Sequence, residues 1–400
     1  MNFIKLLLIL TLLSIIPGQL IRIPVSGAVI TVSDMAVAAT VVVSAVYLFT
    51  VKKSVKLNPT ITIPALIFTL LAGSSTILAL NVFSKMEVLT SSLFIVRFLL
   101  YYAISIIVSN VVEKKEIESW QNVFIVSVFA YTSFGFLQLA VFPDLSQLVQ
   151  YGWDPHVQRL VSSLLDPNFS GGLITIATAV AISLFLKSSQ KIYLLVSAIF
   201  FVGIVLTLSR SSYLALIAAL TVIGILKSPK LLGVFVLIGF FSYFAVPQVK
   251  SRVEGAFSLD ETAQARIQSW QKAIVIFSKN PVSGVGFNTY RYAQEDYGFF
   301  TQTDPTGGHS GAGSDSSFLL VLATTGIIGT TFYFYFLISI LKIILKNIRK
   351  NYLHLAALAS YVALLIHSQF VNSLFFPQIM LAFWFIFGLV LKNDENTKTI

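Results

Sequence analysis

Twelve long apolar segments dominate this chain of 400 residues and restrict it to one kind of architecture. Hydrocarbon offers no hydrogen-bond partners, so a backbone that crosses a membrane must form helices or a closed barrel. The apolar runs here are continuous and lack the alternation of barrel strands, which favours helices. Only 11% of the residues are charged and the mean hydropathy is +0.85, which excludes an ordinary soluble domain. We therefore expect an all-α polytopic membrane protein.

The predicted spans divide the chain into three parts. Residues 1–247 hold spans one to nine and an external loop at 143–168. Residues 248–314 form a large external loop, and residues 315–400 hold the last three spans and a cytoplasmic tail. The first segment lacks a clear signal-peptide cleavage site and is kept as a helix. The twelve segments are 3–21, 27–51, 60–82, 88–112, 120–142, 169–186, 192–208, 211–226, 231–247, 316–341, 352–372 and 374–391.

Basic residues distinguish the two faces of the membrane. With a cytoplasmic N-terminus, 16 of the 27 basic residues lie in cytoplasmic connections and 15 of these are lysines, as the positive-inside rule requires. Both termini are then cytoplasmic. Ten basic residues lie outside, and six of them are arginines, whose planar guanidinium suits phosphate better than lysine does. These six, which could also be ordinary loop charges, are Arg22, Arg159, Arg210, Arg252, Arg266 and Arg291.

Cofactor chemistry has little support in the sequence. The chain has no cysteine, which excludes disulfides, iron–sulfur clusters and thiolate zinc. Its four histidines have no ligand spacing and its acidic residues form no D-x-D pair, so we expect no metal and no other cofactor. The net charge of +10 is explained by membrane topology, so we expect no nucleic-acid partner. The histidines are His156, His309, His354 and His367.

The two long external loops carry local structure signals. In loop 143–168, the sequence "DPN" predicts the start of the sixth span. In loop 248–314, Ser258 and Glu261 match a capping box at the start of a helix that Asn280-Pro281 ends. Apolar residues at helical spacing predict the face that this helix lays on the membrane domain, with Arg266 beside it. They are Ile267, Trp270, Ile274 and Phe277.

Two glycine-containing stretches follow that helix. "PVSGVGFNTYR" is interpreted as a tight turn rather than a phosphate loop, because no strand precedes it. "TDPTGGHSGAGSDSS" is rich in Gly and Ser and is placed to act as a lid or hinge.

Four motifs in order resemble the O-antigen ligase/polymerase family of bacterial membrane glycosyltransferases. "RLVSSLLDPNFSG" resembles the family's Arg and "(D/N)PN" segment, and "TLSRSSYLAL" its "SR" at the outer end of a helix. "ARIQSWQKAIVIFSKNPVSGVGFNTY" resembles the Arg–Trp–Pro–Gly-x-Gly segment of its large external loop. "DSSFLLVLATTGIIG" resembles the opening of its next helix. The motifs span roughly residues 155–335.

The resemblance implies a GT-C-like enzyme of the bacterial inner membrane with its active site on the external face. Its substrates would be an undecaprenyl-pyrophosphate-linked glycan and an acceptor hydroxyl, with a chain-length regulator or a flippase as partner. Polymerase is favoured over ligase because polymerases are the more diverse members of the family. A transporter or flippase is the second alternative, but the sequence shows no internal repeat and no matched broken helices. A structural membrane protein would not explain the arginines.

The pyrophosphate leaving group needs positive charge in the transition state. Arg210, at the outer boundary of a span, and Arg266, on the loop helix, are the leading candidates. Interfacial snorkelling is the alternative for Arg210, and surface charge is the alternative for Arg159. Arg159, Arg291 and Tyr290 are supporting binding residues.

The acceptor hydroxyl also needs a general base. The family's loop histidine falls at Asp315 and its glutamate at Thr324, so this chain departs from both. Asp315 and His309, six residues earlier, are both candidates. Asp315 could instead cap the tenth span.

Two charges fall inside predicted spans. Counted from the outer ends, Asp34 and Arg97 lie about 10 and 15 Å deep at 1.5 Å per residue. Charges at such depth must pair or face a cavity. An ion pair between the second and fourth helices is the leading interpretation, and lining the glycan groove is the second.

Overall fold

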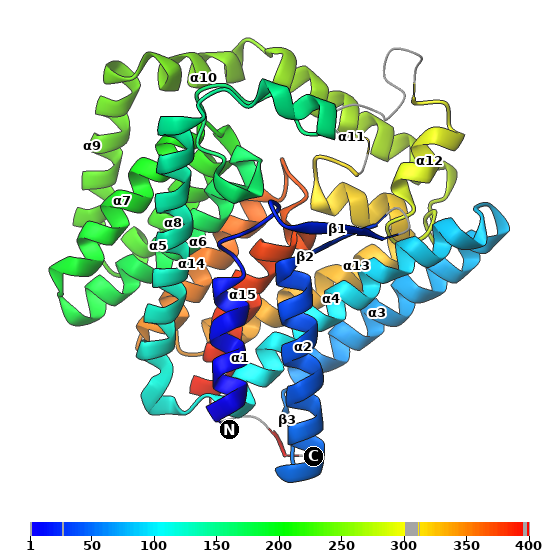
Figure 1. Ribbon diagram of the computed structural model, residues 1–400, viewed down its shortest axis with the longest axis horizontal. Coiled ribbons are helices and arrows are strands. Elements are labelled where there is room, and N and C mark those ends of the chain that lie inside the picture. The colour runs from blue at the N-terminus through cyan, green and yellow to red at the C-terminus, as the bar shows by residue number, and fades with distance from the viewer. Residues whose placement is uncertain (1, 26–27, 301–310, 312, 395–397, 400) are drawn as a thin grey trace.

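The computed structural model describes residues 2–25, 28–300, 311, 313–394 and 398–399, and in that part the fold is almost entirely helical (Figure 1). The helices of the first half are α1 (Asn2–Leu13), α2 (Val32–Val46), α3 (Pro59–Leu78), α4 (Lys85–Val111), α5 (Ile117–Val141), α6 (Pro167–Ser188), α7 (Lys191–Thr207) and α8 (Arg210–Leu226). The later helices are α9 (Pro229–Ala245), α10 (Pro247–Phe257), α11 (Glu261–Lys279), α12 (Tyr290–Asp296), α13 (Ser317–Leu345), α14 (Tyr352–His367) and α15 (Pro377–Asn393). The strands are β1 (Arg22–Val25), β2 (Ala28–Thr31), β3 (Lys56–Leu57) and β4 (Lys398–Thr399).

Each predicted apolar segment overlaps a helix, but the helices differ in length. Among the described residues, six helical segments are long and apolar enough to cross a membrane, or seven if the bent pair α9 and α10 is one span. Five further apolar helices have only 12 to 17 residues. The membrane character is confirmed, while the number twelve stays a prediction.

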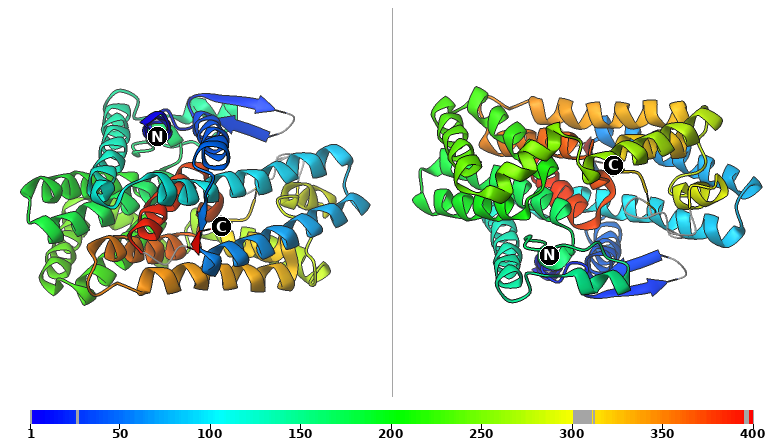
Figure 2. Two further views of the ribbon diagram at one scale, coloured as in Figure 1. Left: turned by 90° about the horizontal axis from the view of Figure 1, so that it is seen from below. Right: turned by 90° about the horizontal axis from the view of Figure 1, so that it is seen from above.

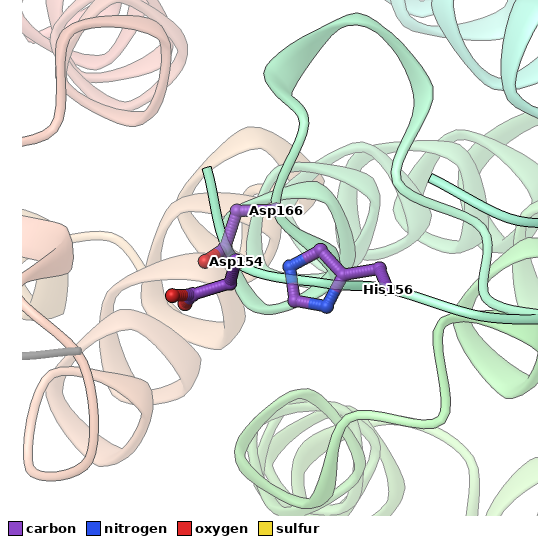
Figure 3. A group of neighbouring side chains, drawn as sticks. All are labelled: Asp154, His156 and Asp166. Carbon is purple, nitrogen blue, oxygen red and sulfur yellow. The ribbon is translucent and has the colours of Figure 1, made fainter. Parts of the chain in front are cut away.

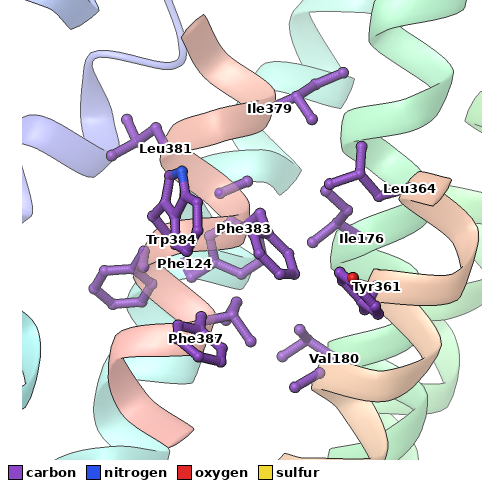
Figure 4. Packing of buried hydrophobic residues seen from close by; sticks show 14 of the residues in the cluster. Phe124, Ile176, Val180, Tyr361, Leu364, Ile379, Leu381, Phe383, Trp384 and Phe387 are labelled. Atoms are coloured by element: carbon purple, nitrogen blue, oxygen red, sulfur yellow. The ribbon is translucent and has the colours of Figure 1, made fainter. Parts of the chain in front are cut away.

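Helix α15 forms the centre of the bundle. Figure 2 shows α1, α2 and the paired strands β1 and β2 on one face of the molecule and α13 on the opposite face, with α15 between them. Every residue from Pro377 to Leu391 is buried. Figure 4 shows Phe383, Trp384 and Phe387 of α15 among side chains of the neighbouring helices. A Cβ at Gly388 would come within 2.8 Å of the Val108 side chain, so this glycine lets α15 pack closely on α4.

The N-terminal hairpin corrects the predicted second span. The predicted helix 27–51 begins instead with strand β2, which pairs with β1 in antiparallel register from Arg22–Thr31 to Val25–Ala28. Thr31 then caps α2 through the backbone N–H of Asp34, whose carboxylate accepts from the Thr31 N–H in return. Asp34 therefore lies in the first turn of its helix rather than about 10 Å inside it.

The expected pairing of Asp34 with Arg97 is confirmed. Arg97 Nε lies 2.9 Å from Asp34 Oδ1, and Arg97 Nη2 also donates to the Val29 carbonyl oxygen at 2.6 Å. The Tyr101 hydroxyl donates to Asp34 Oδ1 at 3.0 Å. The pair joins α4 to α2 and the hairpin. It satisfies both charges where desolvation would otherwise be costly.

The Gly-x-Gly segment is a tight turn, as predicted, and it fits a break in α13. Gly284 and Gly286 have φ of +68° and +108°, and a Cβ at Gly284 would lie 2.3 Å from the Thr324 backbone. The N–H groups of Val285 and Gly286 donate to carbonyls of α13 beside Gly326, where φ is +63° and ψ is −168°. Thr324, at the position of the family's glutamate, is buried and donates its hydroxyl to its own helix.

The large loop is more helical than predicted. It holds α10, α11 and α12, and α10 meets α9 at an angle of 99°. The cap of α11 is Asp260, which accepts from Ala263 N–H, so the predicted capping box of Ser258 and Glu261 is wrong. Asp260 is closer to the first helical residue and accepts the N3 hydrogen bond itself. In Figure 1, α10, α11 and α12 lie at the end of the molecule opposite the N- and C-terminal ends.

The predicted apolar face of α11 is also wrong. The buried residues are Arg266, Ser269, Ala273 and Ile276, whereas Ile274 is exposed. Small side chains let α11 approach α13 closely, and the arginine on this face turns toward a cavity instead of solvent. Helical periodicity identified the helix but placed its buried face about one position away.

Candidate functional site

Two adjoining cavities lie between α11 and the helices of the bundle. We call the first the amide cavity, after its amide residues Gln19, Asn168, Asn288 and Asn372; its volume is about 320 Å³. We call the second the arginine cavity, after Arg159, Arg210, Arg252 and Arg266; its volume is about 340 Å³. Asp154, Asn168 and Arg266 line both cavities, so the two are neighbours with a common wall.

Arg266 is the central cation of this site. It lies in the second turn of α11, and only 9% of its surface is exposed. Within the described residues, no hydrogen bond or ion pair involves its guanidinium group. Burial, more than any other cause, lowers the pKa of Arg266, and Asp315 opposes the shift. A buried guanidinium without a partner is costly, and an anionic ligand would offset that cost.

Arg210 connects the arginine cavity to the cap of α11. It is the first residue of α8, following the cap residue Ser209. Its Nη2 atom donates to Asp260 Oδ1 at 2.8 Å, while its Nη1 atom is buried and lacks a hydrogen-bond partner in the described part of the chain. Burial raises the pKa of Asp260, but the Arg210 hydrogen bond and the Ala263 N–H outweigh it, so the net shift is downward. One half of the Arg210 guanidinium thus remains available to a ligand.

Arg159 is held by backbone groups rather than by acids. Its Nε donates to the Thr207 carbonyl oxygen at 2.9 Å and its Nη2 to the Leu208 carbonyl oxygen at 3.3 Å. Burial, followed by the charge of Arg252, lowers the pKa of Arg159 to about 10. Arg252, on α10, was counted among the outside arginines but was not proposed as a site residue; the structure brings it into the same cavity.

The remaining predicted site residues do not all line the two cavities. Arg291 and Asp315 line the amide cavity, together with Arg266. Tyr290 lines neither cavity; it is buried in a small core formed by α11, α12 and α13. Burial, and then the charge of Asp315, raises the pKa of Tyr290, which keeps it neutral. His309 lies outside the described residues.

Asp315 does not cap the next helix, so that alternative is wrong. The cap is Ser316, whose hydroxyl accepts from the Leu319 N–H. The Asp315 backbone is held by α11 instead, since its N–H donates to Ser269 Oγ at 2.9 Å and its carbonyl accepts from Trp270 Nε1 at 3.3 Å. Anchored in this way, the Asp315 carboxylate faces the cavity that contains Arg266.

A group that sequence reasoning missed lies beside the common wall (Figure 3). One donor atom each of Asp154, His156 and Asp166 lie within 4.8 Å of one another, close enough to suit a metal ion. Asp166 also caps α6 through the N–H groups of Asn168 and Phe169, and its charge acts on Arg159 and Arg266. These carboxylates therefore already face positive charge. The spacing of Asp154 and His156, two residues apart, was a signal that could have been noticed.

Comparison with known families agrees with the motifs. Residues 195–334 match the sequence model of the family described as O-antigen ligase, while no curated protein matches the chain. The matched segment runs from α7 to the middle of α13 and includes Arg210, Arg252 and Arg266. The predicted membership of this region in the O-antigen ligase/polymerase family is therefore confirmed. The "DPN" segment lies before the matched residues.

Proposed function

We propose that this protein is a membrane glycosyltransferase that polymerises undecaprenyl-pyrophosphate-linked oligosaccharide repeat units. The observation that carries the proposal is the arginine cavity, in which Arg266 is buried beside three other arginines and has no hydrogen bond or ion pair among the residues that the structure describes. Four guanidinium groups face only two carboxylates there, Asp154 and Glu261. Such a surplus of positive charge in a partly closed cavity suits a pyrophosphate ester.

The chemistry that we propose is a direct displacement. The acceptor oxygen forms a bond to the anomeric carbon as the bond from that carbon to the phosphate oxygen breaks, and the electron pair leaves with the pyrophosphate. This inverts the anomeric centre. Arg266 and Arg210 stabilise the charge that develops on the leaving group, without a metal ion, and Arg159 holds the cavity wall beside them.

The proposed base is Asp315. It lines the amide cavity, which shares Arg266 with the arginine cavity, so one carboxylate and one guanidinium group face the same space. The proton of the attacking hydroxyl would pass to the Asp315 carboxylate as the new bond forms. His309 stays the alternative base. Arg291 lies on the same cavity and is proposed to contact the glycan.

The site and its surroundings fit a lipid substrate at a membrane boundary. We propose that the protein resides in the bacterial inner membrane, with both termini in the cytoplasm and the cavities on the external side. Arg266 of α11 lines both cavities, and α11 lies at the end of the molecule opposite the N- and C-terminal ends (Figure 1). A chain-length regulator or a flippase is the proposed protein partner.

The second candidate function is that of a ligase, which the description of the matched family favours. A ligase would use the same donor but transfer the glycan to a lipid A-core or another acceptor. Purified protein in nanodiscs should therefore be given the lipid-linked repeat alone, or the repeat plus a lipid A-core acceptor. A ladder of longer lipid-linked glycans from the first mixture supports polymerase. A single product that requires the core acceptor supports ligase.

The same assay tests the site. Arg266→Ala should abolish product in either mixture, whereas Lys85→Ala, at the exposed start of α4, should not. Full activity in Arg266→Ala, or movement of the lipid-linked glycan across the bilayer without any product, would contradict the proposal.

A further inference from the structure

We infer that the amide cavity binds the acceptor sugar that carries the attacking hydroxyl, an inference that rests on the proposed function. The two cavities differ in charge. Four arginines and two carboxylates line the arginine cavity, whereas three arginines and three carboxylates line the amide cavity. The balanced cavity also has four side-chain amides, against one in its neighbour. A cavity lined by equal numbers of positive and negative side chains and by several amides suits a polyhydroxylated neutral ligand rather than a pyrophosphate.

The amides are placed to receive such a ligand. Gln19 and Asn288 are half-buried, and in the described part of the chain their side-chain amides make no hydrogen bond. Asn372 uses its Oδ1 to accept from Ser317 Oγ at 3.2 Å. Each side-chain amide can both donate and accept, which matches the paired hydroxyls of a sugar ring. The three residues come from the turn after α1, the Gly-x-Gly turn and the connection between α14 and α15, so only the tertiary fold brings them together.

Aromatic rings provide an apolar part of the same wall. Phe370 and Phe376 line the cavity, and Phe376 is stacked on Phe169 with ring centroids 3.7 Å apart and planes at 14°. The C–H face of a pyranose ring is apolar and packs on such a surface, while its hydroxyl edge meets the amides. This combination of apolar lining and few polar groups is usual for small-molecule sites, and about 320 Å³ lies at the lower end of their range.

The shared wall explains how the two substrates would meet. Asp315 lies on the amide cavity, and Arg266 belongs to both cavities. A sugar hydroxyl held by the amides would lie on the same side as the proposed base. The anomeric carbon of the donor would lie at the shared wall, with its pyrophosphate among the arginines. The new bond would then form on the side of the amide cavity, and the pyrophosphate would leave on the side of the arginine cavity.

The test uses two ligands and wild-type protein in nanodiscs. The first ligand is undecaprenyl pyrophosphate without glycan, and the second is the lipid-free oligosaccharide repeat. Asn288→Ala combined with Gln19→Ala should weaken oligosaccharide binding at least tenfold, the loss expected for one or two hydrogen bonds, and leave the lipid within twofold. Arg266→Lys should weaken binding of the lipid pyrophosphate at least tenfold and leave oligosaccharide binding within twofold. Binding is measured by isothermal titration and by the KM for the acceptor, which should rise more than kcat falls.

Gln190→Ala is the matched control, because Gln190 is an exposed amide before α7, at the other end of α6 from the cavities. Its binding of both ligands should equal that of the wild type. If the wild type binds the lipid pyrophosphate but shows no saturable oligosaccharide binding, the acceptor site is overturned while the proposed function stands. If the amide variants weaken both ligands equally, the two cavities are one site and the division is overturned. If the wild type binds neither ligand, the proposed function fails as well.

Discussion

Two arginines that line the amide cavity, Arg97 and Arg266, differ in their ionic partners. Arg97 is paired with Asp34, donates to the Val29 carbonyl oxygen and shares its carboxylate with Tyr101. Arg266 is at least as well buried but has no hydrogen bond or ion pair within the described residues. Arg97 thus has its counter-ion within the fold, and we propose that an anionic ligand compensates the charge of Arg266. Burial alone therefore does not mark an arginine as functional, whereas the burial of Arg266 without a partner among the described residues supports its proposed role in ligand binding.

The largest effect is expected at Arg266. Arg266→Lys keeps the charge but loses the planar fork, and should lower kcat about 100-fold, equivalent to about 2.7 kcal/mol of transition-state stabilisation. Because this arginine has no partner to lose in the described part of the chain, the free energy of unfolding should change by less than about 1 kcal/mol. Glycan transfer rates and unfolding curves in the same detergent provide both numbers. A large loss of stability with unchanged kcat would mean that Arg266 stabilises the fold and does not act in catalysis.

The opposite result is expected at the paired arginine. Arg97→Gln should destabilise the protein by about 3 kcal/mol, because it leaves the largely covered Asp34 carboxylate beside Tyr101 without its cation. Asp34→Asn with Arg97→Gln should be milder than the sum of the two single changes. Thermal unfolding of the four proteins completes the cycle. Additive effects would mean that the two charges do not act as a pair.

A smaller effect is expected at Asp260, whose carboxylate accepts a hydrogen bond from Nη2 of Arg210. Asp260→Asn keeps a good helix cap but removes the ion pair, so the affinity for undecaprenyl pyrophosphate should rise about threefold as Arg210 is released. Lipid titration measures this change. Unchanged or weaker binding would mean that Arg210 needs Asp260 to stay in the cavity.

The same residue makes a pH-dependent contribution to stability. Folding lowers the pKa of Asp260, so its contribution is complete above the unfolded value of 3.8 and is lost as the pH falls through the lower folded value. The stability difference between wild type and Asp260→Asn should therefore shrink as the pH falls below about 4 and through the lowered pKa of Asp260. Unfolding at several pH values tests this. A difference that grows on acidification would give the wrong sign.

The smallest effect is expected from metal removal. Arg159 and Arg266 already provide positive charge near Asp166, so treatment with EDTA should change the transfer rate by less than about twofold. Rates before and after dialysis against the chelator test this. If EDTA removes activity that Mn²⁺ restores, and if Asp154→Asn prevents this restoration, the group in Figure 3 is a metal site.

Much of the framework was predictable because it depends on local pattern. Apolar runs located the helices, "DPN" located the start of α6, and the Gly-x-Gly segment was correctly interpreted as a turn. Local signals failed where two helix starts competed, so that Asp260 and Ser316 cap α11 and α13 instead of the predicted residues. The buried face of α11 was misplaced because periodicity assumes a wholly apolar face, whereas this one carries Arg266 toward a polar cavity and small side chains toward α13.

From the sequence alone, the helical membrane architecture and the family resemblance could be derived, and the external position of the long loops could be predicted. These properties follow from hydropathy, charge and short-range order along the chain. Which charges are already paired depends on the tertiary structure, because a partner such as Asp34 for Arg97 is 63 residues away. The tertiary structure also brought Gln19, Asn288 and Asn372 to one cavity and Arg159, Arg210, Arg252 and Arg266 to another. Packing sets such distances, and no local pattern records them.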